Sequence, residues 1–463
     1  MRLNFAAFGI AAMVVTAALA SSPPSLTDRL IVHEWGTFTV LQDEQGNVIG
    51  GVNTDDEPVP PFVHSVNSSV IRDETQAPSI FSKGVPACDR SVWVRLETPV
   101  IYFHAPPGHS KAIDVDVAFH GGWLTQFYPN AQVDAPELTD REYVPGRLTD
   151  ATLGKLGWHN LRLVAGRAGP RTTDPVWLWP RQVEARDLTA ENGESERFIF
   201  YRGVGHVKTP LRVLRTEDGK HFEIRADLDQ ASSVPSSMGP LWLVDVRDDG
   251  KMAMRSIARI AWGGKQAPLP IDASFTDDQY SSDLTALRRS LRSALVGGGL
   301  YDDEADALLN TWETSYFRRP GLRLFYLVPR GWTDRTLPMR IGEPGGNGGP
   351  APEVRRLMVG RIELVKPEQR RRLAQIAKGP ASNPAWLFGA MSALGGDRSD
   401  TEGWLKNLAD GTQTPGAPHV DVPTDYRAYL ELGRFRNALI LEEESRRPTP
   451  ALKAFIQSYA LGS

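Results

Sequence analysis

The chain has 463 residues, a formal net charge of −4 at pH 7 and a single cysteine, Cys88. A chain of this length can bury a large core and divide into two or three domains. The slightly acidic charge disfavours nucleic acid and anionic membrane surfaces as partners. A lone cysteine excludes an internal disulfide bond.

The first twenty residues have the layout of a cleavable signal peptide. Arg2 supplies an early positive charge, an apolar run follows over 5–17, and the small residues Ala18 and Ala20 come next. This apolar run is too short for an ordinary transmembrane helix, and no later stretch reaches ~20 consecutive apolar residues. We therefore expect an exported chain without a membrane span, secreted or periplasmic, that begins at Ser21.

Period-two alternation dominates from about residue 29 to 262 and predicts strands, so 21–272 are predicted as a β-rich domain. In 113–119 the apolar residues occupy every second position. The segments 241–246 and 252–260 flank Asp248-Asp249-Gly250, a sequence typical of a hairpin turn. Further strands are predicted over 91–103, 197–201, 211–215 and 222–226. Many short strands separated by turns favour an antiparallel β-sandwich-like portion.

Helical periodicity appears after this region. Residues 273–366 are predicted as a mixed α/β segment, and 367–463 as a helical C-terminal portion. The mixed segment has predicted helices over 283–295 and 303–317 and predicted strands over 322–328 and 354–365. Together with the signal peptide over 1–20 and the β-rich domain over 21–272, this organisation predicts a β-rich α+β fold.

The segment 31–40 places two ionisable residues, His33 and Glu34, in an otherwise apolar strand. Buried ionisable groups usually have a partner or a task. A zinc-protease motif would need a second histidine at the position of Thr37, so that motif is absent. Neighbours on a strand face opposite sides, so one site can hold both residues only if Gly36 marks a bulge or bend. The structural alternative pairs Glu34 with an arginine and His33 with a carbonyl group.

Glu97 is a second candidate carboxylate. It shares a strand face with Arg95, which favours a simple salt bridge. The functional alternative makes Glu97 the partner of Glu34, so that two carboxylates flank a substrate bond. The sequence leaves both alternatives open.

Three further candidates lie beyond residue 200. Arg202 and His206 end a strand that contains two glycines, and strand ends often carry sites. Glu313 lies at the edge of an apolar helix stripe, where it is either a boundary residue or a functional one. Six of the nine histidines fall in the first 160 residues, which favours a metal or acid–base site there and leaves the metal and any cofactor unknown.

Several of these segments resemble a group of secreted bacterial proteins of unknown function. The segment 33–39 (HEWGTFT) resembles the signature of that group. The similar segments are 97–103, 201–205, Trp312-Glu313 followed by Phe317, and 359–363, so the resemblance spans about 30–368. It implies export and a shared fold, and it implies no activity. His104 and His120 depart from the pattern of the group.

Two classes of function remain open. The first is an extracytoplasmic hydrolase of a small molecule, glycan or peptide. Its carboxylates, Glu34 or Glu97, would act as general acid or base, His33 and His206 would orient groups or shuttle protons, and Arg202 would hold an anionic group. The second is a non-catalytic secreted binding or surface protein with an aromatic-lined cleft. An enzyme requires these residues and Glu313 to meet in one open pocket, whereas separate buried pairs favour the second class.

Overall fold

The computed structural model describes residues 29–53, 59–66, 81–82, 85–86, 89–97, 99–106, 108–109, 111–136, 148–167, 169–227, 234–262, 270–346, 351–386 and 421–459. The predicted signal peptide and Cys88 lie outside these residues. The fold is β-rich α+β, with one large mixed sheet and a helical C-terminal portion.

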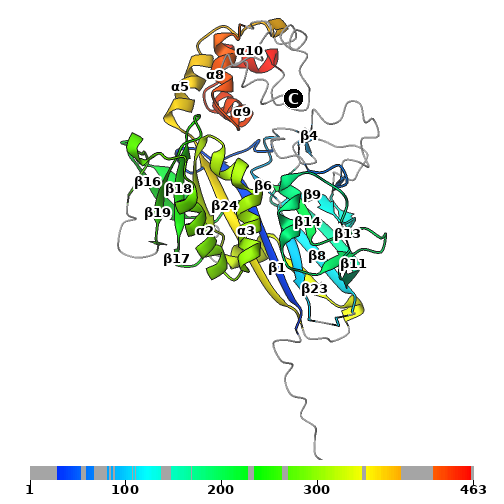
Figure 1. Ribbon diagram of the computed structural model, residues 1–463. Coiled ribbons are helices and arrows are strands. Elements are labelled where there is room, and N and C mark those ends of the chain that lie inside the picture. The colour runs from blue at the N-terminus through cyan, green and yellow to red at the C-terminus, as the bar shows by residue number, and fades with distance from the viewer. Residues whose placement is uncertain are drawn as a thin grey trace, which may run out of the picture.

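Two long strands form the centre of the molecule. β1 (Ile31–Gln42) and β24 (Glu353–Leu364) pair in parallel along their whole length, and they run side by side in Figure 1. On its other edge β1 pairs antiparallel with β7 (Val100–His104) and then with β6 (Val94–Leu96). One sheet therefore contains strands from both 21–272 and 273–366, and those domain boundaries remain predictions.

The large sheet extends from this centre in both directions. Beyond β24 follow β22 (Gly321–Leu327), β18 (Leu241–Val246) and β19 (Met252–Ile257), and beyond β6 and β7 follow β14 (Ile199–Gly205) and β9 (Gly122–Tyr128). The strand β8 (Ile113–His120) pairs with β11 (Leu153–Val164) and β23 (Met339–Gly342). A separate sheet contains β15 (Leu211–Arg215), β16 (His221–Ala226) and β21 (Ile271–Asp272).

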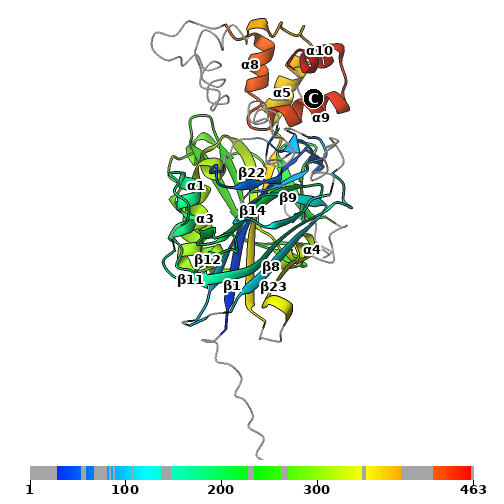
Figure 2. The ribbon, with the colours of Figure 1, turned by 90° about the vertical axis from the view of Figure 1, so that its right-hand side faces the viewer.

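The two faces of the central strands contact different cores. On one face Trp35 and Tyr102 pack against α2 (Thr285–Gly297) and α3 (Asp302–Thr311). On the other face Val32 and Phe38 join a larger core, which includes Trp332 of α4 (Arg330–Thr336). Figure 2 shows α3 and α4 on opposite sides of the sheet. Successive residues of β1 therefore enter different environments.

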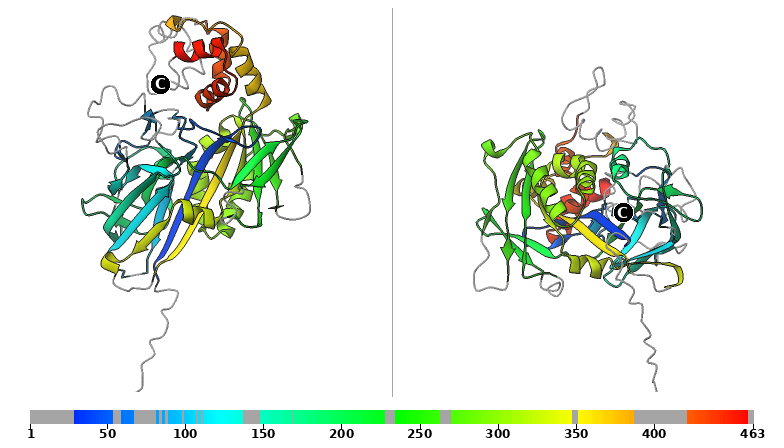
Figure 3. Two further views of the ribbon diagram at one scale, coloured as in Figure 1. Left: turned by 180° about the vertical axis from the view of Figure 1, so that it is seen from behind. Right: turned by 60° about the horizontal axis from the view of Figure 1, so that its bottom comes forward.

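The C-terminal helices gather at one end of the molecule, as Figures 1 and 3 show. They are α5 (Pro367–Ile376), α8 (Thr424–Leu430), α9 (Arg436–Arg446) and α10 (Pro450–Ser458). Arg370 of α5 joins them to the rest of the chain, because its Nε lies 2.8 Å from Oε1 of Glu44 in the turn after β1.

Two predicted elements are divided in the structure. The strand expected over 91–103 becomes β6 and β7, and Pro99, which lacks a backbone donor, lies between them. The helix expected over 303–317 ends as α3 at Thr311, and a π-helical turn, η7 (Glu313–Arg318), follows.

None of the helices in the described ranges combines the length and the apolar character that crossing a membrane would need.

Candidate functional site

Glu34 is a fully buried member of an ion pair. Arg356 lies directly opposite it in the β1–β24 register and donates from Nε to its Oε2 over 2.6 Å. The hydroxyl of Tyr201 on β14 donates to the other carboxylate oxygen. Burial and the charge of Glu34 raise the pKa of Tyr201. Burial alone would lower the pKa of Arg356, but the charge of Glu34 outweighs this and raises it. Glu34 is therefore paired with an arginine, as the structural alternative from the sequence expects.

His33 points to the opposite face of β1. No register shift occurs along β1 and β24, so Gly36 marks no bulge that could turn both side chains to one side. The Nδ1 atom of His33 lies 2.7 Å from Oε2 of Glu304 in α3. Its partner is therefore a carboxylate, not the carbonyl group expected in the structural alternative.

Glu97 also lies in a closed ion pair. Arg95 contacts it through Nε, and neither side chain is exposed. A second guanidinium, that of Arg434, lies 3.8 Å from the same carboxylate. Since Glu34 and Glu97 each have their own arginine partners and no exposed area, they do not form a carboxylate pair around an open substrate site.

Arg202 and Glu313 occupy two further places. Arg202 is buried and donates from Nε to the side-chain oxygen of Gln126 on β9. Glu313 is partly exposed at the start of η7, 2.9 Å from Arg288 and 2.6 Å from Arg318. The six predicted residues thus do not converge.

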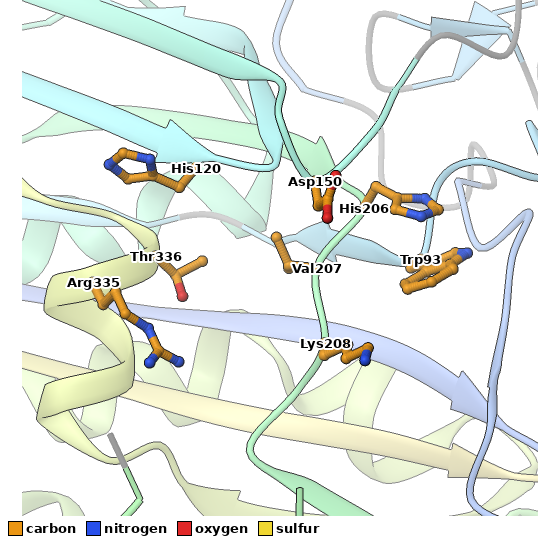
Figure 4. A pocket seen from close by; sticks show the side chains of 8 residues that line it. All are labelled: Trp93, His120, Asp150, His206, Val207, Lys208, Arg335 and Thr336. Carbon is orange, nitrogen blue, oxygen red and sulfur yellow. The ribbon is translucent and has the colours of Figure 1, made fainter. Parts of the chain in front are cut away.

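His206 lines a pocket in the described part of the chain. Figure 4 shows this cleft, with Arg335 and Thr336 of α4 on one side and Trp93 and His206 on the other. Its volume is about 510 Å³. The lining residues are Trp93, His120, Asp150, His206, Val207, Lys208, Arg335 and Thr336.

Backbone contacts and ring stacking fix the His206 side of the cleft. The imidazole lies over Trp93 with 3.6 Å between ring centroids. Its Nδ1 is 2.7 Å from the carbonyl oxygen of Ser91, which can only accept, so Nδ1 donates and Nε2 of a neutral ring is left as an acceptor. Gly121 holds the β8–β9 turn at a φ of +79°, and a Cβ there would lie only 2.5 Å from Val207. Glycine is therefore required for this close approach.

The cleft combines aromatic surface with charge. Trp93 and His206 supply rings, Lys208 and Arg335 supply two positive charges, and Asp150 supplies one negative charge. Lysine and arginine side chains can pair with a ligand that carries a carboxylate or a phosphate.

A second group, which the sequence analysis did not assemble, surrounds Glu304. Its carboxylate lies 2.7 Å from Nδ1 of His33 and 3.0 Å from Nε2 of His104, and it also accepts from the backbone N–H of Tyr301 over 2.7 Å. Burial alone would raise the pKa of Glu304, but the hydrogen bonds from His104 and His33 outweigh it and lower the pKa to about 2. These are residue types that can hold a metal ion.

The histidine half of this group had a sequence signal, the clustering of histidines before residue 160. The carboxylate half had none. Glu304 lies 200 residues after His104, in an acidic first turn that equally suits a helix N-terminus.

Comparison with known proteins adds no relationship. No family model matches the sequence, and no curated protein matches it significantly. Two solved structures of the yeast delta-COP-I mu-homology domain can be aligned with much of the chain. The complex with a Dsl1 WxWxV peptide has a TM-score of 0.23 and 8% identity, and the match covers 73% of this chain and 97% of that one. The uncomplexed domain has a TM-score of 0.24 and 8% identity, with 74% and 98% covered. Both TM-scores are too low to indicate a shared fold.

Proposed function

We propose that this chain is an exported protein that binds a small acidic ligand in the cleft around His206. The observation that carries the proposal is the composition of that cleft, in which Trp93 lies beside His206 and the cations Lys208 and Arg335 line the same space. The two carboxylates of the competing hydrolase hypothesis, Glu34 and Glu97, are instead held in buried ion pairs.

The chemistry of the cleft suggests the class of ligand. An aromatic ring offers a large flat apolar surface, and arginine and lysine pair with a carboxylate or phosphate. Asp150 and Nε2 of His206 can accept hydrogen bonds from hydroxyl groups. A volume of about 510 Å³ lies in the usual range for small-molecule sites. An acidic sugar, which has a ring, hydroxyl groups and a carboxylate, meets all of these conditions.

Export is the second part of the proposal. It rests on the signal-peptide layout of the first twenty residues and on the resemblance of 33–39 to secreted bacterial proteins. Intact-mass measurement of the protein from the exported fraction should give an N-terminus at Ser21. A chain that retains Met1 and stays in the cytoplasm would contradict this part.

Calorimetric titration with matched pairs of sugars tests the ligand class. Glucuronate should bind more tightly than glucose, and galacturonate more tightly than galactose, by about 10-fold or more, because a charge-assisted hydrogen bond contributes roughly 1.5–3 kcal/mol. Equal affinity for both members of each pair, or no binding of any of them, would reject an acidic-sugar site.

Variants then locate the binding. Trp93→Ala should remove the aromatic surface, and Arg335→Ala should remove much of the preference for the acidic sugar. Arg371→Ala is the matched control, because Arg371 is exposed on α5 and forms a local ion pair with Glu368. Unchanged titrations for both cleft variants would place the binding elsewhere.

A further inference from the structure

Three side chains with metal-ligand chemistry meet on the face of the sheet that α3 covers. In the antiparallel β1–β7 register, Ile31 is opposite His104 and His33 is opposite Tyr102. His33 and His104 are therefore diagonal neighbours on one face of the sheet. Long side chains can span the distance between such neighbours. Their ring centroids are 4.9 Å apart. The first turn of α3 brings Glu304 against both rings.

The compactness of this group fits one ion. One ring nitrogen from each histidine and one oxygen of Glu304 all lie within 4.8 Å of one another. Two ligands at zinc distances of ~2.0–2.1 Å in a tetrahedral site are about 3.4 Å apart. Movements of about an ångström by these side chains would therefore bring all three to a common ion.

Burial gives an independent indication of a ligand. His33 and Glu304 have no exposed side-chain area, and the side chain of His104 is 12% exposed. Since the carboxylate can only accept, Nδ1 of His33 is the donor in its contact with Glu304. The second nitrogen, Nε2, is buried and has no hydrogen-bond partner within the described ranges. A buried polar atom without a partner is unfavourable, and a lone pair on an imidazole is a common metal ligand.

We propose that His33, His104 and Glu304 form a binding site for a divalent transition metal such as zinc. Two imidazoles and a carboxylate suit zinc and its neighbours in the first transition row better than magnesium or calcium, which prefer oxygen ligands alone. Three protein ligands leave a further coordination position for water or another small ligand. The partial exposure of His104 and of the adjacent Tyr301 gives the ion a route to solvent.

This site goes beyond the proposed function, because it lies apart from the cleft around His206. The metal site belongs to β1, β7 and α3, whereas the cleft includes residues of α4 on the opposite side of the sheet. Either site can exist without the other, so the two proposals fail separately.

Metal titration of the full mature chain, freed of metal by a chelator, tests the proposal. Zinc should bind with one equivalent per chain, and cobalt should give a visible absorption spectrum with nitrogen and oxygen ligands. His104→Ala and Glu304→Gln should weaken zinc binding by at least the ~10–100-fold that changes next to metal ligands typically cause. His159→Ala is the matched control, because His159 and Asp116 form a similar histidine–carboxylate pair at the surface. It should leave the affinity unchanged.

A second measurement uses the unmodified protein, so it does not depend on whether the variants fold. In the unmodified protein, bound zinc should protect His104 from diethyl pyrocarbonate while His159 stays reactive, as read by peptide mass spectrometry. Stoichiometric binding, loss in the two site variants and protection of His104 support the site. Absence of one-equivalent binding, unchanged affinity in both variants, or zinc that leaves the reactivity of His104 unaltered would overturn it.

Discussion

A strand that is covered on both faces explains the charged residues at the start of the chain. Every residue of β1 after Ile31 is buried, so Glu34 cannot reach water and must be compensated inside the protein. Arg356, its direct neighbour across the parallel pair, provides the opposite charge. Because Glu34 is buried, its carboxylate needs the opposite charge that Arg356 provides.

Glu34→Gln should be strongly destabilising. It preserves the shape of the side chain but leaves the guanidinium of Arg356 buried without its counter-charge. Removing one partner of a buried ion pair typically costs 3–5 kcal/mol or so in the free energy of unfolding. Urea unfolding of the purified variant measures this loss.

Glu353→Gln is the control for that measurement. Glu353 is on the same strand as Arg356, but its pair with Arg355 is partly exposed, and exposed pairs contribute only about 0–1 kcal/mol. If Glu34→Gln unfolds at nearly the same urea concentration as the parent protein, the ion pair is not structural and the catalytic hypothesis regains support.

At the scale of elements, Gly36 lies where two strands on the edge of β1 meet. β7 pairs with β1 up to Trp35, and β6 pairs with it from Phe38 onwards. Pro99 lies between these strands and approaches Gly36 closely. A Cβ on Gly36 would lie 2.9 Å from the Cα of Pro99 and 2.9 Å from the sulfur of Met358. The glycine thus permits close packing of backbones, and the bulge considered from the sequence is absent.

Gly36→Ala should therefore destabilise the protein. Overpacking of a core that cannot relax costs ~1–3 kcal/mol, and here one of the two obstacles is backbone. Gly342→Ala on β23 is the control, since no atom lies within 4 Å of a Cβ at that position. Thermal unfolding of both variants should show a clear fall for the first only. Equal melting temperatures would contradict this account of Gly36.

The junction of the C-terminal helices with the sheet should respond to acid. Burial alone would raise the pKa of Glu44, but the hydrogen bond and charge of Arg370 outweigh it and hold the pKa below its usual value of 4.5. A carboxylate with a lowered pKa contributes stability that is present above about pH 4.5 and lost as the pH falls through the folded-state value. The same arginine also contacts Glu442 and Glu443 of α9.

Glu44→Gln should flatten the acid limb of the stability profile. Urea unfolding between about pH 6 and about pH 3 would show a smaller loss of stability in this variant than in the parent. Glu431→Gln, which alters a more exposed pair with Arg372, should keep the parental slope. An unchanged slope in Glu44→Gln would show that the junction does not depend on this carboxylate.

Local sequence patterns were enough to predict many elements. The alternation in β8 places Ile113, Val115, Val117 and Phe119 in the core, and the β18–β19 hairpin forms at its predicted turn. The parallel pairing of β1 with β24 was not predicted, because it joins segments more than 300 residues apart and leaves no local pattern. The π-helical turn after Thr311 was missed for a different reason. Its apolar stripe resembles that of a continuous helix.

In the whole molecule, the candidate residues have partners that no spacing in the sequence encodes. Opposite faces for His33 and Glu34 follow from strand alternation alone. The partners of these two residues cannot be predicted from strand alternation, because Arg356 and Glu304 come from the distant β24 and α3. The cleft likewise combines Trp93, the end of β14 and α4. His206 had a signal, through its place at a glycine-rich strand end.

We propose that the molecule binds its ligand at the cleft around His206 and not at the opening strand. Hydrogen–deuterium exchange of the mature chain, with and without glucuronate, tests it most directly. Bound ligand should slow backbone exchange in peptides that contain 148–152, 205–208 and 330–336, and leave β1 and α3 unchanged. Protection confined to β1, β7 or α3, or no protection in any peptide, would contradict the claim.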